Sequence, residues 1–160
     1  MIRNATKDDL GEILKIYAIA RRMMQATGNP DQWGKNRPKY DAIVKDIEDG
    51  NMYVIEEENE INAVFSLIDF DEDYLDIQGE WLNDEHYLAI HKIASSGKKG
   101  GVFSKVLEFA KTKTNNIRID THKHNKIMQL HIKKNGFEYV GIVYIEGELE
   151  RLAYHLVVKW

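Results

Sequence analysis

The stretch from Ile90 to Lys111, IHKIASSGKKGGVFSKVLEFAK, constrains the fold of this chain more than any other. It begins with alternating apolar residues, which are typical of a strand, and continues into a loop rich in glycine and lysine. Apolar residues then recur at helical spacing, at Val102, Val106, Phe109 and Ala110. The stretch therefore predicts a strand, a tight loop and a helix.

The start of this predicted helix has the properties of an anion site. A helix that begins directly after a glycine-rich loop directs unpaired backbone N–H groups and the positive end of its dipole at whatever lies before it. Gly100 and Gly101 allow a ligand close to the backbone, and Lys98 and Lys99 add positive charge. The spacings GxxxxGK[ST] and GxGxxG are absent, which disfavours a nucleoside-triphosphate or nicotinamide site. A simple turn at a solvated corner is the alternative interpretation.

The composition is that of a single globular domain. The 160 residues are 43% hydrophobic and 30% charged, so one core can form, and we expect one domain over residues 1–160. The absence of cysteine excludes disulfides, thiol nucleophiles and zinc–thiolate sites and favours a reducing cytoplasm; no metal site is predicted. We expect no membrane span and no signal peptide, because no apolar run approaches ~20 residues. A net charge of -4 argues against nucleic acid as the main partner.

Hydrophobic periodicity and turn residues predict the order strand, helix, helix, three strands, helix, strand, helix and two strands. The predicted strands are 1–5, 52–56, 61–68, 87–95, 117–121, 137–145 and 149–158. The predicted helices lie between Thr6 and Gly28, between Pro38 and Gly50, after the glycine loop in the stretch that ends at Lys111, and over 126–134. This order predicts an α/β fold with a mixed, mostly antiparallel seven-stranded sheet flanked by about four helices. A crevice is expected where the crossover strand leaves its neighbour.

Two segments allow more than one interpretation. The loop 29–39 carries Trp33, which is either a lid over a pocket or, as we prefer, an anchor that holds the loop to the core. The segment 69–76, DFDEDYLD, is strongly acidic. It is either a collar that attracts a cationic acceptor or, as for most charge runs, a solvated loop.

The order of elements, the helix start KKGGVF and the later run NKIMQLHIKKNGF together resemble the GNAT superfamily of N-acetyltransferases over nearly the whole chain. The resemblance implies a GNAT-like fold with acetyl-CoA as co-substrate. In that family a loop motif Q/R-x-x-G-x-G/A holds the pyrophosphate of acetyl-CoA through backbone N–H groups. Lys98 stands at the Q/R position, Gly101 at the first glycine and Phe103 at the second, so two of these three positions depart from the motif.

The resemblance also implies which residues bind acetyl-CoA. The pyrophosphate would lie against Lys98, Lys99, Gly100, Gly101, Val102, Phe103 and Ser104. The end of the central strand, at Ile93, Ala94 and Ser95, would pair through its backbone with the pantetheine arm. Asn125 matches a family asparagine that bonds the pantetheine or orders the helix start, and a plain N-cap is the alternative.

The mechanism implied by the resemblance is direct attack of an amine on the thioester, which needs a base, an oxyanion donor and an acid. A backbone N–H of the central strand can be the oxyanion donor. The family's acid is a tyrosine, and Ile132 stands at that position; His131 is adjacent but turned by about 100° around the helix. Water or the ammonium formed in the reaction are the other proton donors.

The candidates for the base are His122, His91 and Glu80. His122 is preferred, because it follows the strand that borders the predicted crevice and histidine titrates near neutral pH. His91 has apolar strand neighbours and is interpreted as a packed core histidine. Glu80 is equally consistent with ordinary surface, and a water chain without a dedicated base is a further alternative.

Two functions remain open on the sequence. The first is an acetyl-CoA-dependent N-acetyltransferase that acts on a primary amine of a small molecule, an amino acid derivative or a peptide. The second is a non-catalytic acyl-CoA-binding sensor or partner module, which the missing tyrosine and the bulky Phe103 favour. Substrate positioning alone can sustain catalysis, which supports the first. Exposed sheet edges and the terminal Trp160 are compatible with a homodimer.

Overall fold

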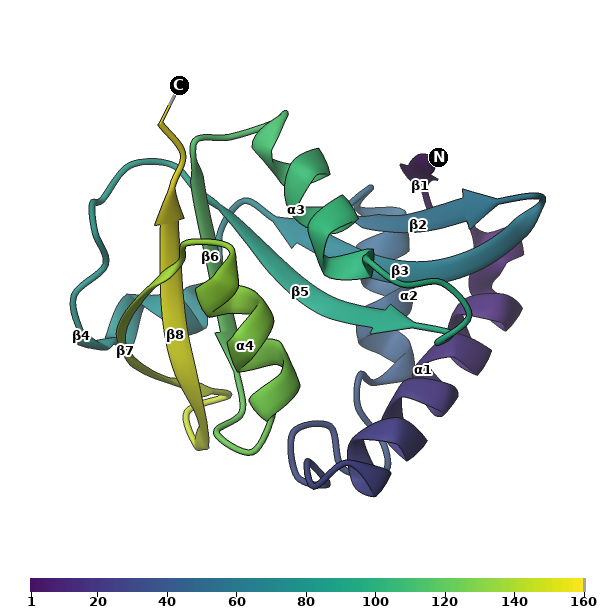
Figure 1. Ribbon diagram of the computed structural model, residues 1–160, viewed down its shortest axis with the longest axis horizontal. Coiled ribbons are helices and arrows are strands. Elements are labelled where there is room, and N and C mark those ends of the chain that lie inside the picture. Colours follow the sequence, from purple (N-terminus) through teal and green to yellow (C-terminus); the bar gives the residue numbers. More distant parts are fainter. Residues whose placement is uncertain (160) are drawn as a thin grey trace.

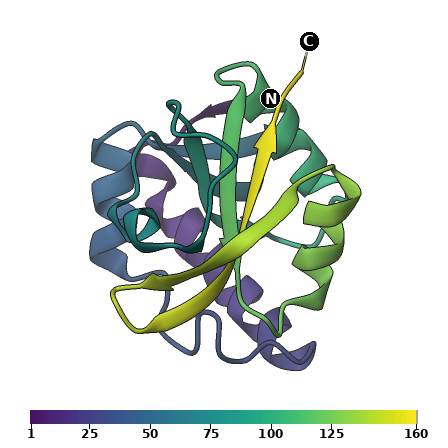
Figure 2. The same ribbon diagram turned by 90° about the vertical axis from the view of Figure 1, so that its left-hand side faces the viewer.

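The computed structural model describes residues 1–159, which form one central sheet with helices on both faces (Figure 1). Its strands are β1 (Ile2–Asn4), β2 (Met52–Glu57), β3 (Glu60–Ile68), β4 (Gln78–Gly79), β5 (Leu88–Ser95), β6 (Asn116–Thr121), β7 (Glu138–Ile145) and β8 (Leu149–Val157). Its helices are α1 (Leu10–Ala26), α2 (Tyr40–Glu48), α3 (Val102–Lys111) and α4 (Lys126–Lys134), with 3-10 turns η1 (Lys7–Asp9) and η2 (Glu72–Asp76). Turned by 90°, the structure shows α2 on one side of the sheet and α3 and α4 on the other (Figure 2).

The predicted mixed, mostly antiparallel fold is confirmed, but the predicted count of seven strands was wrong. The sheet has eight strands in the order β1-β2-β3-β5-β6-β8-β7-β4. The additional strand, β4, pairs with β7 through Gly79 and Gly141. A Cβ on either glycine would lie 2.1 Å from a carbonyl oxygen of the opposite strand, so only glycine permits this approach. A two-residue strand of this kind has no hydrophobic alternation from which it could be predicted.

The sheet divides between β5 and β6, the two strands of its one parallel pair. They pair only from Leu88 opposite Ile117 to Ile90 opposite Ile119. Beyond Ile90, β5 stays with β3, and beyond Ile119, β6 stays with β8. Figure 1 shows the two strands diverging. The strands therefore diverge at the crossover, where a crevice was expected.

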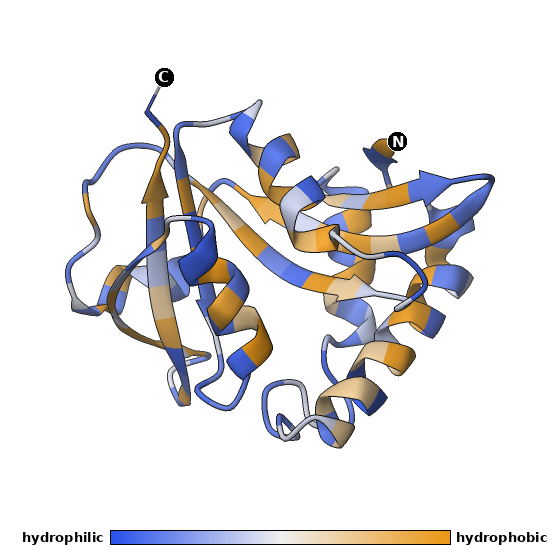
Figure 3. Cartoon of the chain, viewed as in Figure 1, coloured by the Kyte–Doolittle hydropathy of each residue, from blue (hydrophilic) through white to orange (hydrophobic). Residues whose placement is uncertain are grey.

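The apolar side chains pack on both faces of the sheet. On one face, α3 and α4 cover a cluster that includes Phe65, Val106 and Ile132. On the other face, α1 and α2 cover a second cluster around Ile13 and Tyr17. In Figure 3 the hydrophobic colours lie mainly on the strands and on parts of the helices, and the loops are mostly hydrophilic. No helix within residues 1–159 is long and apolar enough to cross a membrane. Trp160, which entered the expectation of a dimer, lies outside the described residues.

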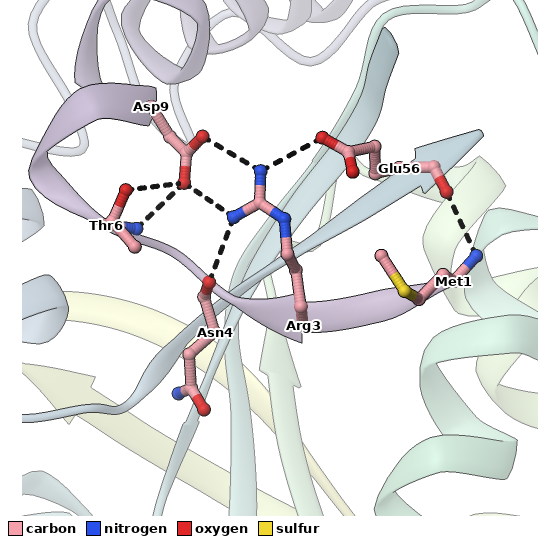
Figure 4. A network of polar contacts seen from close by, with 6 residues as sticks. All are labelled: Met1, Arg3, Asn4, Thr6, Asp9 and Glu56. Carbon is pink, nitrogen blue, oxygen red and sulfur yellow. Dashed lines mark hydrogen bonds and ion pairs between the residues drawn. The ribbon is translucent and has the colours of Figure 1, made fainter. Parts of the chain in front are cut away.

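The edge strand β1 is held by a network centred on Arg3 (Figure 4). Its guanidinium donates to Asp9 Oδ2 at 2.8 Å and Oδ1 at 3.0 Å, and to Glu56 Oε2 at 3.0 Å. The backbone N–H of Thr6 also donates to Asp9, at 2.8 Å. The hydrogen bond from Arg3 lowers the pKa of Asp9 below its ordinary value, although burial acts in the opposite direction. The network joins β1 to η1 and β2.

Arg3→Met is expected to lower the free energy of unfolding by about 1–3 kcal/mol at pH 7, because the substitution removes charge-assisted hydrogen bonds and leaves two carboxylates adjacent. Since the folded pKa of Asp9 is depressed, this stability is present above its unfolded pKa of about 3.9 and is lost as pH falls through the lower folded value. Urea unfolding of both proteins between pH 7 and pH 2 measures the difference. Lys15→Met, which removes only an exposed ion pair with Glu12, should change stability by less than about 0.5 kcal/mol. A difference that is constant over this pH range contradicts the assignment.

Candidate active site

A cavity of about 380 Å³ opens where β5 and β6 separate. Residues of β5 and β6, of the start of η2, of the loop before α2, of the β7–β8 hairpin and of the start of α4 line it. The lining includes Gln32, Trp33, Arg37, Lys39, Asp71, Glu72, Asp73, Ile90, His91, Lys92, Ile93, Ile119, Asp120, Asn125, Met128, Glu146 and Arg151. The cavity is therefore rich in charged groups of both signs.

A bulge in β5 shapes the floor of the cavity. Ser66 of β3 pairs with His91, whereas Val64 pairs with Ala94, so β5 carries one extra residue, and Lys92 takes a left-handed φ of 54°. The hydroxyl of Tyr17 donates to the Lys92 carbonyl at 2.7 Å, and Lys92 Nζ lies 2.9 Å from Asp46 Oδ2. An extra residue in a bulge is left out of the strand ladder. The bulge thus follows directly after His91 and interrupts the regular pairing at the cavity.

His91 lies between two carboxylates that come from other elements. Its Nε2 is 2.6 Å from Asp71 Oδ2, and its Nδ1 is 3.8 Å from Asp120 Oδ2. Asp120 accepts a hydrogen bond from the hydroxyl of Tyr74 at 2.6 Å. The bond to Asp71 assigns the proton of the neutral ring to Nε2, so Nδ1 is the nitrogen that can accept a proton. His91 is half-buried, with its side chain 17% exposed, and its contacts are polar, so it is not the packed core histidine that its apolar strand neighbours indicated.

The charges around His91 favour its protonated form. Burial alone would lower the pKa of His91, but the hydrogen bond with Asp71 and the charges of Asp120 and Asp71 outweigh burial and raise it above 6.5. Burial acts to raise the pKa of Asp71, and the bond and charge of His91 overcome this and lower it. The pKa of Asp73 is raised by burial, with contributions from the charges of Asp71 and Asp120. His91 therefore combines a fixed tautomer with titration above its ordinary range, which suits a general base.

Of the four predicted catalytic residues, only His91 lines the cavity. His122 follows the end of β6, where its Nδ1 accepts from the backbone N–H of His124 at 3.0 Å; burial and the charge of Arg151 lower its pKa. Glu80 is exposed beyond β4. His131 is exposed on α4 and stacks on Phe103 with ring centroids 5.9 Å apart. The structure does not bring these three residues to His91.

The start of α3 has free hydrogen-bonding capacity. Gly101 is the N-cap with a left-handed φ of 73°, and no side chain caps the helix. A Cβ at Gly100 or Gly101 would meet no atom within 4 Å, so the space in front of the first turn is open. Val102 and Ser104 belong to this turn. A helix start of this kind fits an anionic group.

The residues beside this helix start are partly engaged elsewhere. Lys98 pairs with Glu60, whereas Lys99 is exposed in the loop. Phe103, at the second glycine position of the family motif, is 5% exposed and packs in the core under α3 and α4. Its ring therefore contributes to the core. The large side chain of Phe103, where the motif has a small residue, packs against Phe137 and His131.

The remaining predicted cofactor residues lie at the divergence of the sheet. Ile93, Ala94 and Ser95 follow the last β5–β6 pair, so this edge of β5 has no strand beside it. Asn125 Oδ1 accepts from the backbone N–H of Met128 at 3.1 Å, as an N-cap does, and its Nδ2 donates to Gln32 Oε1 at 2.9 Å. Asn125 thus caps α4 and also lines the cavity.

Sequence reasoning missed the partners of His91 and the contribution of the two ambiguous segments. Asp71 and Asp73, from the acidic segment, line the cavity, although the segment was preferred as a solvated loop. Trp33 packs edge-on against Tyr17 with centroids 5.6 Å apart, which supports the anchor interpretation, and it also lines the cavity. Arg151 and Gln32 had no signal in the sequence, because their places depend on how distant strands and loops meet.

Solved structures resemble the whole chain. An acetyltransferase of the GNAT family from Streptococcus agalactiae is 30% identical, with a TM-score of 0.87 over 100% of this chain and 96% of that one. A GNAT-family acetyltransferase from Listeria monocytogenes is 20% identical, with a TM-score of 0.74 over 99% and 94%. The yncA protein of Salmonella typhimurium, solved with its cofactor acetyl-CoA, is 15% identical, with a TM-score of 0.63 over 99% and 94%. No protein-family model and no curated protein matches the sequence.

The divided sheet, the cavity at its division and the agreement with these structures define the fold as that of an acetyltransferase. The 30% identity with the Streptococcus agalactiae protein, over 100% of this chain and 96% of that one, also shows the family. This chain belongs to the GNAT family of acetyltransferases, as the sequence resemblance implied, and its role at family level is acyl transfer.

Proposed function

We propose that residues 1–160 form one acyl-CoA N-acyltransferase domain that transfers the acetyl group of acetyl-CoA to the primary amine of an acceptor. The observation that carries this proposal is the His91–Asp71 pair, 2.6 Å apart, in the cavity where the sheet divides. A histidine with a fixed tautomer beside a bulged strand is suited to accept the proton of an attacking amine.

The residues present fit acetyl-CoA, which the yncA structure contains. When bound, acetyl-CoA supplies an activated acetyl thioester. The open backbone N–H groups at Gly101, Val102, Phe103 and Ser104 would hold its pyrophosphate, with Lys98, Lys99 and Gly100 in the loop before them. The unpaired edge of β5 at Ile93–Ser95 would bond the pantetheine amides, and Asn125, the N-cap of α4, lines the same cavity as Ile93.

His91 would take the proton of the amine on Nδ1 while Asp71 holds the ring through Nε2. Asp120, 3.8 Å from Nδ1, would stabilise the imidazolium that forms. The bulge after His91 would direct a backbone N–H at the negative charge that develops on the carbonyl oxygen. Ile132 is fully buried and offers no acid. The leaving thiolate would therefore take its proton from the imidazolium formed on His91 or from water.

The experiment that tests the proposal has two stages. Isothermal titration with acetyl-CoA measures binding, and release of free thiol in the presence of a panel of primary amines then measures transfer. We expect binding, and thiol release that depends on at least one amine. The buried Ile132 favours the alternative, a non-catalytic acyl-CoA-binding sensor. Binding without thiol release across the whole panel would support the sensor and contradict the transferase.

The pH dependence provides a separate prediction. Because neutral His91 is the active form, kcat/KM should fall as pH drops through its pKa, which lies above 6.5. Asp71→Asn removes the carboxylate that raises this pKa, so the acidic limb should move to lower pH while the plateau falls. Asp76→Asn, on the exposed side of the same turn, should leave the limb in place. Profiles of kcat/KM between pH 5 and pH 9 for the wild type and both variants test this prediction. An unmoved limb in Asp71→Asn would contradict the assignment of His91.

A further inference from the structure

Two arginine side chains in the described part of the chain are almost fully buried, Arg118 at 5% and Arg151 at 6% exposure. Within residues 1–159, no carboxylate oxygen lies within 4.0 Å of either guanidinium. A buried positive charge is costly unless other groups compensate it. We therefore compare the groups that compensate the buried positive charge of each guanidinium.

The charge of Arg118 is met by aromatic rings. Its guanidinium carbon lies 4.1 Å from the centroid of Trp81 and 4.0 Å from that of Tyr87, and its NH2 donates to the Asn83 carbonyl at 2.9 Å. A guanidinium stacked on aromatic faces is stabilised by their quadrupoles. Arg118 has a structural role and does not line the cavity.

Arg151 has no such rings among the described residues. Its guanidinium donates to two backbone carbonyls, those of Glu150 at 3.0 Å and Gln32 at 2.7 Å, which fix its position but carry no negative charge. Burial lowers its pKa; the charge of Asp120 opposes this effect, and the charge of Arg37 adds to it. Arg151 lines the cavity. It is a fixed cation whose charge is available to a ligand.

The register of the sheet places Arg151 close to the proposed base. Asp120 of β6 pairs with Ala153 of β8, and Arg151 is two residues from Ala153 on the same face of the strand. Diagonal neighbours of this kind have Cα atoms about 7–8 Å apart. Asp120 is also the carboxylate 3.8 Å from His91 Nδ1. A small molecule can therefore place an amine at His91 and another group at Arg151.

We propose that Arg151 binds the carboxylate of the acceptor, so that the acceptor is an amine that carries its own carboxylate, such as a free amino acid. The inference rests on the proposed transferase function and names its substrate class. The planar guanidinium can bond both oxygens of a carboxylate. Two other cationic side chains that line the cavity are already paired, Lys92 with Asp46 and Arg37 with Glu146. Lys39, which also lines the cavity, comes from the loop before α2. The carboxylates at His91 would attract the ammonium end of the same molecule.

Isothermal titration of the CoA-saturated protein with free L-amino acids and with their C-terminal amides tests this inference without turnover. At least one acid should bind about 10- to 100-fold more tightly than its amide, since a bond to a charged group contributes about 1.5–3 kcal/mol. Arg151→Gln should reduce this ratio to below about 3-fold. The matched variant Arg118→Lys should lower the melting temperature but keep the ratio.

The wild-type protein gives a second measurement if Arg151→Gln does not fold. The NMR shift of the Arg151 Nε–H group should move on addition of the acid and not of the amide. Equal binding of acid and amide, an unchanged ratio in Arg151→Gln, or no binding of either compound overturns the inference. Failure of the transferase proposal appears differently, as amino acid binding without thiol release.

Discussion

His91→Gln is expected to lower kcat/KM by about 10²- to 10⁴-fold, the range that general bases contribute. Glutamine keeps much of the shape of histidine and can still donate to Asp71, but it cannot accept a proton near neutral pH. The measurement is thiol release at saturating acetyl-CoA with an acceptor found in the amine panel. Titration with acetyl-CoA should give a dissociation constant within about threefold of wild type, because the proposed pyrophosphate site lies at α3.

His122→Gln is the matched comparison, since His122 does not line the cavity. We expect a change of only a few-fold in kcat/KM. A loss of less than tenfold in His91→Gln would remove His91 as the base. A larger loss in His122→Gln than in His91→Gln would restore the sequence-based preference for His122. Circular dichroism and thermal unfolding of both variants show whether any loss reflects misfolding.

Gly101→Val is expected to raise the dissociation constant of acetyl-CoA by about 10- to 100-fold. The added side chain would occupy the open space before the first turn of α3 and keep a phosphate from the backbone N–H groups. Loss of one such charge-assisted bond is worth about 1.5–3 kcal/mol. Isothermal titration with acetyl-CoA measures the change directly.

The control must separate ligand exclusion from backbone strain, because Gly101 has a φ of 73° and valine is strained there by about 1–2 kcal/mol. Gly50, after α2, has a φ of 74° and equally open surroundings. Gly50→Val should therefore lose similar stability and keep its affinity for acetyl-CoA. If both variants lose affinity alike, or if Gly101→Val keeps it, the pyrophosphate assignment is wrong.

Local signals predicted the elements that build the site. The helix over residues 126–134 was predicted with its observed bounds, because Asn125 is a good N-cap and Asn135–Gly136 is a good stop. The central strand, loop and α3 followed from a change of hydrophobic period. The residues that give such signals lie within the predicted element or a few positions from it in the sequence.

The arrangement around His91 could not be predicted in this way. Its partner Asp71 is the N-cap of η2 and its partner Asp120 lies in β6, and nothing near His91 in the sequence indicates them. Apolar neighbours indicated a core histidine, but partial burial beside two carboxylates makes His91 a titrating group of the cavity. The strand β4 was missed because its pairing depends on two distant glycines.

The narrow parallel contact between β5 and β6 has a consequence for cooperativity. Only three residue pairs join β5 and β6, fewer than join any other two neighbouring strands inside the edge strands β1 and β4, and this contact lies at the binding cleft. A ligand that forms hydrogen bonds with both diverging strands would connect them where they no longer pair with each other. Ligand binding would then make this part of the sheet more rigid. In the ligand-free protein, the backbone amide protons of β5 and β6 beside the cleft would exchange faster than in the ligand-bound protein.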